Sequence, residues 1–452
     1  MHIFPQLRKI EEKYANELVV IGVHSAKFPN EKEKENLYKA VQRNELQHPV
    51  VNDADFKVWQ AFSCRAWPTF MFIDPEGKVI GKHEGEVTFE FLDDLMENMV
   101  AEFDAQGLLR RESLGITAGE GPAATLSFPG KVLADGPGDR LFIADTNHNR
   151  ILVTSLEGVV QQVIGSGRAG LDDGGFAAAT LNHPQGMARL GEVLYVADAE
   201  NHALRKVDLA AGTVETIAGN GQQGRAREGR GPGLQTELNS PWDLALHQNT
   251  LYIAMAGAHQ LWSMTLADGQ VGPYAGSGGE SITNGPLASA TLAQPSGITC
   301  GEDNGGDSGG SKLYFVDSET SSVRSADLDP AGRVGTLVGL DLFVFGDVDG
   351  SEHNVRLQHP IGIAFEDGVI YITDTYNHKI KQILPITRSA LTVLGTGEAG
   401  HKDGPGKQAL FSEPSGLSFG GGKLFIADTN NHLIRVADLA ADQVWTLDIS
   451  GL

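Results

Sequence analysis

One stretch of the chain decides its fold: Leu141-Phe-Ile-Ala-Asp145-Thr-Asn-His148. It reads as a short apolar strand that ends in Asp, followed by a polar turn and a second strand. Before each such stretch stands an opening made of an apolar residue, two variable residues and a proline, usually with glycine two residues further on. The openings are Leu126–Pro129, Leu181–Pro184, Leu238–Pro241, Leu292–Pro295, Leu357–Pro360 and Phe411–Pro414. The steps between them are 55, 57, 54, 65 and 54 residues.

A fixed period of this length with strand-rich units is typical of a β-propeller. One unit cannot bury its own apolar face, so several units stack around an axis. We therefore predict an all-β, six-bladed propeller over residues 119–452, with four strands in each blade. The sequence does not decide between two ways of closing the ring. In one, blade 6 packs directly on blade 1; in the other, residues 113–117 add to the last blade as a clasp. Because many unrelated activities share this fold, it does not by itself give the function.

The first 103 residues have a different pattern. Apolar residues at helical spacing alternate with short β-branched runs, in the order α-β-α-β-(α)-β-β-α. The run 18–23 predicts a buried strand, and residues 69–80 predict two strands joined by an Asp-Pro-Glu-Gly turn. We therefore predict an α/β domain over residues 1–103, and a linker or propeller clasp over residues 104–118.

Composition restricts the class of partner. The net charge of −23 argues against nucleic acid and against anionic membrane, because both require a basic surface. Two cysteines, Cys64 and Cys300, are too few for a disulfide framework. No apolar run reaches the roughly 20 residues of a membrane span, and the N-terminus has no signal-peptide pattern. We expect a cytoplasmic protein that binds a protein partner; the oligomeric state is not readable.

The α/β region resembles the thioredoxin superfamily. The segment Trp67-Pro68-Thr69-Phe is similar to its cis-proline loop, and the run Pro-Val-Val-Asn-Asp53 to its redoxin branch. The resemblance implies that an extended peptide pairs with the loop backbone, which makes Trp67, Pro68 and Thr69 the substrate-binding residues. The family's Cys-x-x-Cys is absent from the sequence, and the helix that follows it in the family begins here at Met1.

The domain therefore lacks its first strand and its Cys-x-x-Cys turn as written. Either the true start lies upstream of Met1, or the domain is a remnant without redox activity. Loss of a central strand predicts unpaired backbone groups and a gap in the sheet. We expect no catalytic residue in the chain as written, and Cys64 is expected to act as a small buried hydrophobe.

The propeller resembles the NHL-repeat family through its Asp-x-x-x-His turns. Together with the thioredoxin-like region, the pattern is similar to the NHL-repeat-containing protein 2-like family. Recurrence in several blades favours a scaffold role over catalysis: Asp accepts turn N–H groups and His bridges neighbouring hairpins. The residues expected to have this role are Asp145, His148, Asp198, His202, Asp374, His378, Asp428 and His432.

Positions where copies disagree are candidates for function. In the third copy Trp242-Asp243 replaces the residues after proline, and a turn containing His259 replaces the Asp-Asn-His turn. Asp317 stands in a divergent fourth copy. These four residues form a hypothetical interaction face. An alternative of equal weight is that these positions have drifted without selection.

Three functions follow from these patterns. The first is a scaffold that binds a protein partner, without a cofactor. The second is a thiol–disulfide oxidoreductase whose cysteines lie upstream. The third is a metal-dependent lyase or lactonase, for which His183 and His359 are the available ligands. These two histidines stand in opposite blades, an awkward arrangement for one ion, so we expect no metal site.

Overall fold

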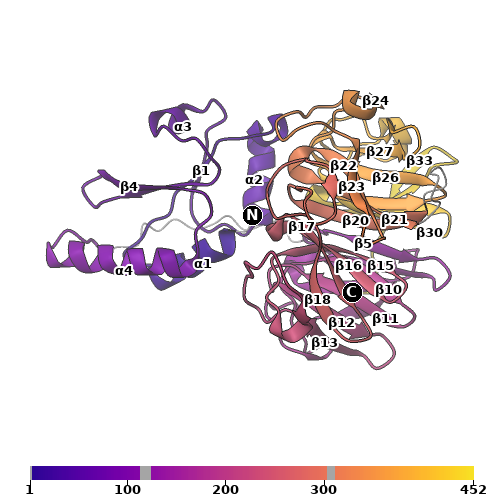
Figure 1. Cartoon of the computed structure of the whole chain (residues 1–452), viewed down its shortest axis with the longest axis horizontal. Coiled ribbons are helices and arrows are strands. Elements are labelled where there is room, and N and C mark those ends of the chain that lie inside the picture. Colours follow the sequence, from indigo (N-terminus) through magenta and orange to yellow (C-terminus); the bar gives the residue numbers. More distant parts are fainter. Residues whose placement is uncertain (1–2, 112–123, 303–310) are drawn as a thin grey trace. The chain divides into compact units, whose positions relative to one another are not determined.

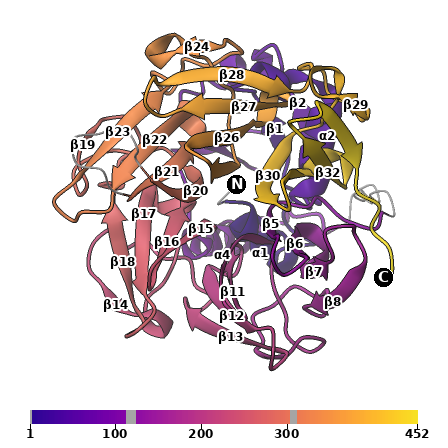
Figure 2. The same cartoon turned by 90° about the vertical axis from the view of Figure 1, so that its right-hand side faces the viewer.

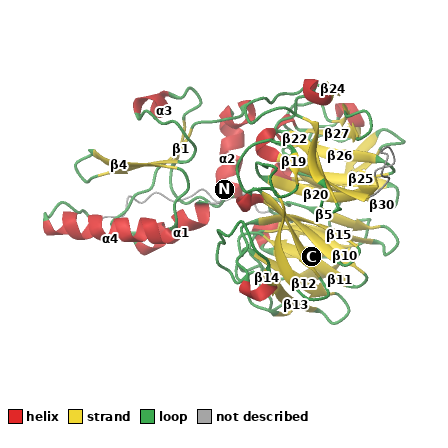
Figure 3. Ribbon diagram, viewed as in Figure 1, coloured by secondary structure: helices red, strands yellow, loops and turns green. Residues whose placement is uncertain are grey.

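The computed structural model describes residues 3–111, 124–302 and 311–452, and it divides the chain into two compact units, Met1–Ala123 and Ala124–Leu452. Helices dominate the first unit and strands the second, as Figure 3 shows. None of the helices in the described part of the chain combines the length and the hydrophobicity needed to cross a lipid bilayer. Residues 113–117, the hypothetical clasp, lie outside the described residues.

The first unit is an α/β domain whose elements follow the predicted order (Figure 1). Its helices are α1 (Phe4–Lys13), α2 (Lys34–Arg43), α3 (Lys57–Ala61) and α4 (Phe89–Ala105), with a 3-10 turn at Pro29–Lys32. Its strands are β1 (Gly22–His24), β2 (Val50–Asn52), β3 (Thr69–Ile73) and β4 (Val79–Glu84). Pro5 fits the first turn of α1, where no N–H is needed, and the Thr88 hydroxyl caps α4 by accepting the Phe91 N–H.

A small core holds this unit together. Helices α1 and α4 contribute Ile10, Tyr14, Leu92 and Met96, against which Phe70 and Phe72 of β3 pack. The strands form two separate ladders: β1 pairs with β2 in parallel, and β3 pairs with β4 in antiparallel fashion. Within the described residues no ladder joins the two pairs.

The second unit is the predicted six-bladed propeller, with the innermost strand of each blade around a common axis (Figure 2). Blade 1 is β5 (Val132–Asp135), β6 (Arg140–Asp145), β7 (Arg150–Thr154) and β8 (Val160–Ile164); blade 2 is β10 (Pro184–Leu190), β11 (Val193–Asp198), β12 (Ala203–Asp208) and β13 (Thr213–Ala218); blade 3 is β15 (Pro241–His247), β16 (Thr250–Met255), β17 (Gln260–Thr265) and β18 (Gln270–Ala275). Blade 4 is β20 (Pro295–Glu302), β21 (Ser311–Asp317), β22 (Ser322–Asp327) and β23 (Arg333–Val338); blade 5 is β25 (Ile363–Glu366), β26 (Val369–Asp374), β27 (Lys379–Leu384) and β28 (Ser389–Leu394); blade 6 is β30 (Pro414–Gly420), β31 (Lys423–Asp428), β32 (Leu433–Asp438) and β33 (Gln443–Thr446).

A short extra strand precedes blades 2 to 6 and pairs with the outermost strand of its blade. These strands are β9 (Gly174–Gly175), β14 (Gly231–Pro232), β19 (Gly285–Pro286), β24 (Gly350–Ser351) and β29 (Gly404–Pro405). Apolar clusters lie between neighbouring blades, such as the one that joins Leu204 of blade 2 to Leu244 of blade 3. The apolar face of one blade is therefore buried by the next blade, as the repeat pattern predicts.

Blade 6 packs directly on blade 1, and within the described residues the four strands of each of these two blades come from a single repeat. Their shared apolar cluster includes Ile143 and Phe425. The end of the chain adds to the outer strand of blade 1: Ser450 donates its N–H to the Gly158 carbonyl at 3.1 Å and accepts the Val160 N–H at 2.9 Å. In this way the chain end partly takes the place that a short extra strand occupies in the other blades.

Candidate functional site

The repeat Asp, which every blade except blade 3 has, is fully buried and holds its own blade in register. In blades 1, 2, 5 and 6 it accepts the backbone N–H of the second residue of the repeat opening, at 2.6 to 2.7 Å. It also faces a cation, as in the Asp428–Arg435 pair at 2.9 Å. Burial raises the pKa of Asp198 and of Asp428. These carboxylates bond to groups of the propeller itself and so stabilise the scaffold.

The residue four positions after the Asp connects neighbouring blades. His202, His378 and His432 have left-handed backbone, and Nδ1 of each accepts the N–H of the residue before the next repeat proline, at 3.1 to 3.2 Å. The His432 bond reaches Phe128 of blade 1 and so closes the ring. His148 differs from the expectation, because it stands three positions after Asp145 and bonds to that carboxylate at 2.8 Å. In blade 1 the bridging residue is Asn149, which accepts the His183 N–H.

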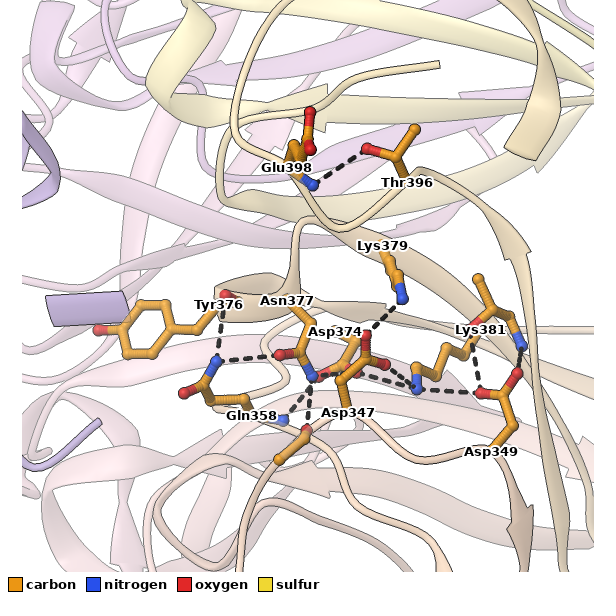
Figure 4. A network of polar contacts seen from close by, with 12 residues as sticks. Asp347, Asp349, Gln358, Asp374, Tyr376, Asn377, Lys379, Lys381, Thr396 and Glu398 are labelled. Atoms are coloured by element: carbon orange, nitrogen blue, oxygen red, sulfur yellow. Dashed lines mark hydrogen bonds and ion pairs between the residues drawn. The ribbon is translucent and has the colours of Figure 1, made fainter. Parts of the chain in front are cut away.

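In blade 5 a lysine takes the place of the arginine of other blades, and Figure 4 shows its contacts. Lys381 is buried, and its Nζ lies 2.8 Å from Asp347, 3.0 Å from Asp349 and 3.5 Å from Asp374. Burial opposes the lysine charge, but the three carboxylates outweigh it and raise the pKa of Lys381 to about 12. Burial raises the pKa of Asp374 to about 6.

The hypothetical interaction face is only partly accessible. Asp317 is fully buried and pairs with Arg324 at 3.0 Å, and Asp243 is buried as well. These two carboxylates cannot contact a partner in this structure, so their place in the interaction face is corrected. Trp242 and His259 are half-buried and lie at the same end of blade 3, where the Ala256 N–H donates to Ser240 O at 3.2 Å.

A lysine that the sequence reasoning missed links blade 1 to three other blades of the propeller. Lys131, just before β5, extends its Nζ across the axis to the carboxylate of Asp243 in blade 3 at 3.0 Å. The same Nζ donates to the carbonyl oxygens of Ser296 in blade 4 and Ile361 in blade 5, at 3.0 and 2.9 Å. Burial lowers the pKa of Lys131 and raises that of Asp243, against the attraction between them.

The backbone around Lys131 and Asp243 is tightly packed against the neighbouring blades. A methyl group on Gly186 would lie 2.1 Å from Asp243 Oδ1, and one on Gly416 would lie 2.5 Å from the Cα atom of Lys131. Glycine two residues after the proline is therefore required by close approach to a neighbouring blade. In two of the six repeats this glycine is replaced, by Lys131 and by Asp243. The opposite charges of these two replacements are a signal in the sequence that could have revealed the ion pair.

In the first unit, the residues expected to bind substrate lie beside an aromatic cluster. The Trp67–Pro68 peptide bond is cis. Trp67 is 48% exposed, donates its indole N–H to Ser25 O at 2.8 Å and lies tilted against Trp59 with ring centroids 4.4 Å apart. The Thr69 hydroxyl donates to Ala66 O at 2.7 Å. The indole and the loop backbone can thus contact a bound peptide.

The cysteines and the candidate metal ligands form no reactive group. Both cysteines are free thiols, and burial raises the pKa of Cys300 to about 12, which keeps it protonated. His183 Nδ1 lies 3.0 Å from Asn182 Oδ1, and His359 stacks on Tyr376. Among the residues that the structure describes, no group of three or more His, Cys, Asp or Glu side chains could hold a metal ion.

Comparison with known proteins agrees with this two-part organisation. A thioredoxin-like family model matches residues 1–79, and an NHL-repeat model matches residues 357–383 and 411–437. NHL repeat-containing protein 2 of Homo sapiens is 39% identical over 99% of this chain, and its counterpart in Bos taurus is 40% identical over 98%. The chain belongs to the NHL repeat-containing protein 2-like family.

Members of this family extend beyond the region matched here. The chain spans 66% of the human relative and 65% of the bovine one. Protein SUPPRESSOR OF QUENCHING 1, chloroplastic, of Arabidopsis thaliana is 43% identical over the whole chain, which covers 44% of that protein. An auxiliary nutrient binding protein from Bacteroides thetaiotaomicron aligns with 72% of this chain and 70% of its own, at 13% identity and a TM-score of 0.49, too low to inform function.

Proposed function

We propose that this chain is a cytoplasmic protein-interaction scaffold, in which the propeller binds a protein partner and the thioredoxin-like unit presents or receives that partner. The observation that carries the proposal is the set of contacts that Lys131 makes across the propeller. Its Nζ bonds to blades 3, 4 and 5, so this buried side chain serves the scaffold and is not available to a substrate. Loops and outer faces are then the surfaces on which this propeller acts.

The side chains of the repeats support the same function. The repeat Asp and the bridging His side chains bond to their own or a neighbouring blade. Their hydrogen-bonding groups are therefore used to hold the propeller together. The free cysteines, Cys64 and Cys300, belong to different units and have no partner thiol within the described residues. Unpaired cysteines also fit a reducing compartment such as the cytoplasm.

The test uses the full chain as immobilised bait for proteins of its host. We expect one protein to be retained in a fixed molar ratio, and Trp242→Ala to reduce its retention at least about tenfold, because a central aromatic contact dominates many interfaces. Trp445→Ala, on the outer strand of blade 6, is the matched control and leaves retention unchanged.

A parallel assay measures reduction of insulin disulfides by the same preparation. The scaffold proposal predicts no turnover, because neither thiol has a resolving partner. Turnover that is lost in Cys64→Ser would show that the protein is a thiol enzyme instead. In the retention assay, equal retention by Trp242→Ala and wild type would show that blade 3 is not the binding face.

A further inference from the structure

The dipeptide Asn-Gly occurs three times in the sequence, as Asn220-Gly221, Asn284-Gly285 and Asn304-Gly305. In this dipeptide the asparagine side chain reacts readily with its own backbone, because the glycine nitrogen can attack the side-chain carbonyl carbon and no Cβ atom on the glycine hinders the approach. The third copy lies outside the described residues. For the other two, the fold decides whether the nitrogen and the carbon can meet.

The first copy lies in an exposed turn between blades 2 and 3. Asn220 is exposed, and residues 219–230 belong to no helix or strand. Oδ1 of Asn220 accepts the Gln222 N–H at 3.0 Å, so the side chain is folded back onto the backbone that contains the Gly221 nitrogen. Gly221 has a φ of +86°, and its N–H makes no backbone hydrogen bond to a described residue. The two atoms that must join therefore lie in one exposed turn, and no backbone contact holds the nitrogen in place.

The second copy has the same chemistry but is held at both residues. Oδ1 of Asn284 accepts hydrogens from the buried Arg324 at 3.1 Å and from the Thr336 hydroxyl at 2.9 Å. Gly285 lies in β19 and pairs with Val334 of β23. The side chain and the backbone must both leave these contacts before they can react with each other.

We propose that the Asn220-Gly221 turn is a site of spontaneous deamidation, and that the fold protects Asn284-Gly285 from the same reaction. The inference goes beyond the scaffold function and does not depend on it.

The reaction needs only water, and it balances without an oxidant or a reductant. Hydroxide removes the proton from the Gly221 nitrogen, this nitrogen bonds to Cγ of Asn220, and ammonia leaves with a proton from water. The product is a five-membered succinimide ring. Water then opens the ring at one of its two carbonyl carbons. Opening at Cγ gives aspartate, and opening at the backbone carbon gives isoaspartate, in which the main chain continues through the former side chain.

The modified residue would lie close to the turn of blade 3 that contains His259. The same loop is attached to this turn: the Gln223 side chain donates to Asn239 Oδ1 at 3.1 Å, and the Asn239 amide donates to Gly257 O at 3.1 Å. Both products add one negative charge to the loop, and isoaspartate also adds a methylene group to the backbone. Deamidation therefore changes the charge and the course of the chain beside blade 3.

The test compares the two sites in one sample of the full chain. The folded protein is kept in mildly alkaline buffer, digested at intervals and analysed by chromatography and mass spectrometry. Trypsin isolates Asn220 in the peptide 207–225, and chymotrypsin separates Asn284 from Asn304. We expect Asn220 to exchange its NH2 for OH at least about tenfold faster than Asn284, because Asn284 reacts only after local opening. The modified peptide 207–225 should elute as two products of equal mass, aspartate and isoaspartate.

Two controls separate the fold from the local sequence. In guanidinium chloride the two sites should react at similar rates, because both dipeptides are then exposed. Asn220→Ser should remove the mass gain from the peptide 207–225, which also contains Gln222 and Gln223. The inference is overturned by the absence of a mass gain at Asn220, by equal rates in the folded chain, by a mass gain that persists in Asn220→Ser, or by a difference between the sites that persists after unfolding.

Discussion

The propeller and the thioredoxin-like unit differ in how completely their strands are paired. In the propeller, every blade is flanked by two others, and even charged side chains such as Arg205 and Arg435 are fully buried and bonded. In the thioredoxin-like unit no described ladder joins the two strand pairs, and aliphatic residues in and just before β1 remain exposed. Radial packing of blades leaves only short, protected strand edges, whereas small separate ladders leave a larger share of their edges and faces uncovered.

The largest effect is expected at the buried ion pair that links blades 1 and 3. Lys131→Met leaves the Asp243 carboxylate buried without its cation, which costs about 3–5 kcal/mol of the free energy of unfolding. Urea unfolding followed by near-ultraviolet circular dichroism measures this cost. Lys206→Met is the control: its pair with Glu215 is exposed on the surface and contributes about 1 kcal/mol or less.

The double variant with Lys131→Met and Asp243→Leu sharpens this test. It removes both charges and should recover most of the lost stability, because apolar replacements of a buried pair are often neutral. If the single and double variants are equally unstable, the packing at the axis is more important than the charge.

A smaller effect follows from the pKa of Asp374, which is about 6 in the folded protein. A carboxyl group whose folded pKa is raised favours the folded state when protonated. Its contribution to stability therefore falls as pH rises from about 4 to about 6, by about 1–3 kcal/mol. Urea unfolding of wild type and Asp374→Asn over this range isolates the change. A wild type that gains stability relative to Asp374→Asn over the same range would contradict the raised pKa.

The sequence predicted the blades because every repeat keeps its proline and most repeats keep the glycine and the Asp. It did not predict the role of Lys131, since a contact across the axis joins residues 112 positions apart and occurs once. The histidine register was wrong in blade 1 for a related reason: Asn149 and His148 exchange the usual order, and only backbone geometry shows which residue bridges. The prediction of a buried strand over residues 18–23 was wrong: β1 is Gly22–His24, and Val19, Ile21 and Val23 are exposed, because burial depends on packing that no local pattern gives.

The bridging histidines offer a comparison within the ring. His432→Ala leaves the Phe128 N–H without its acceptor at the junction that closes the ring, at a cost of about 1–3 kcal/mol. His259 occupies the same position in blade 3, but its buried Nδ1 has no hydrogen-bond partner among the described residues. We expect His259→Ala to cost about 0.5 kcal/mol or less in the same urea experiment. Equal losses would mean that the imidazole stabilises the junction by packing alone.

The smallest effect is expected in β1. Val23 is 44% exposed, so Val23→Thr should change stability by less than about 0.5 kcal/mol, measured by exchange of the amides in β2. Val196 is fully buried in β11, and Val196→Thr places an unpaired hydroxyl in the core at a cost of about 1–3 kcal/mol, measured in the same way in β11. If Val23→Thr costs as much as Val196→Thr, the side chain of Val23 is covered in solution. A small loss means that this side chain is open to water, in contrast to the paired and packed strands of the propeller.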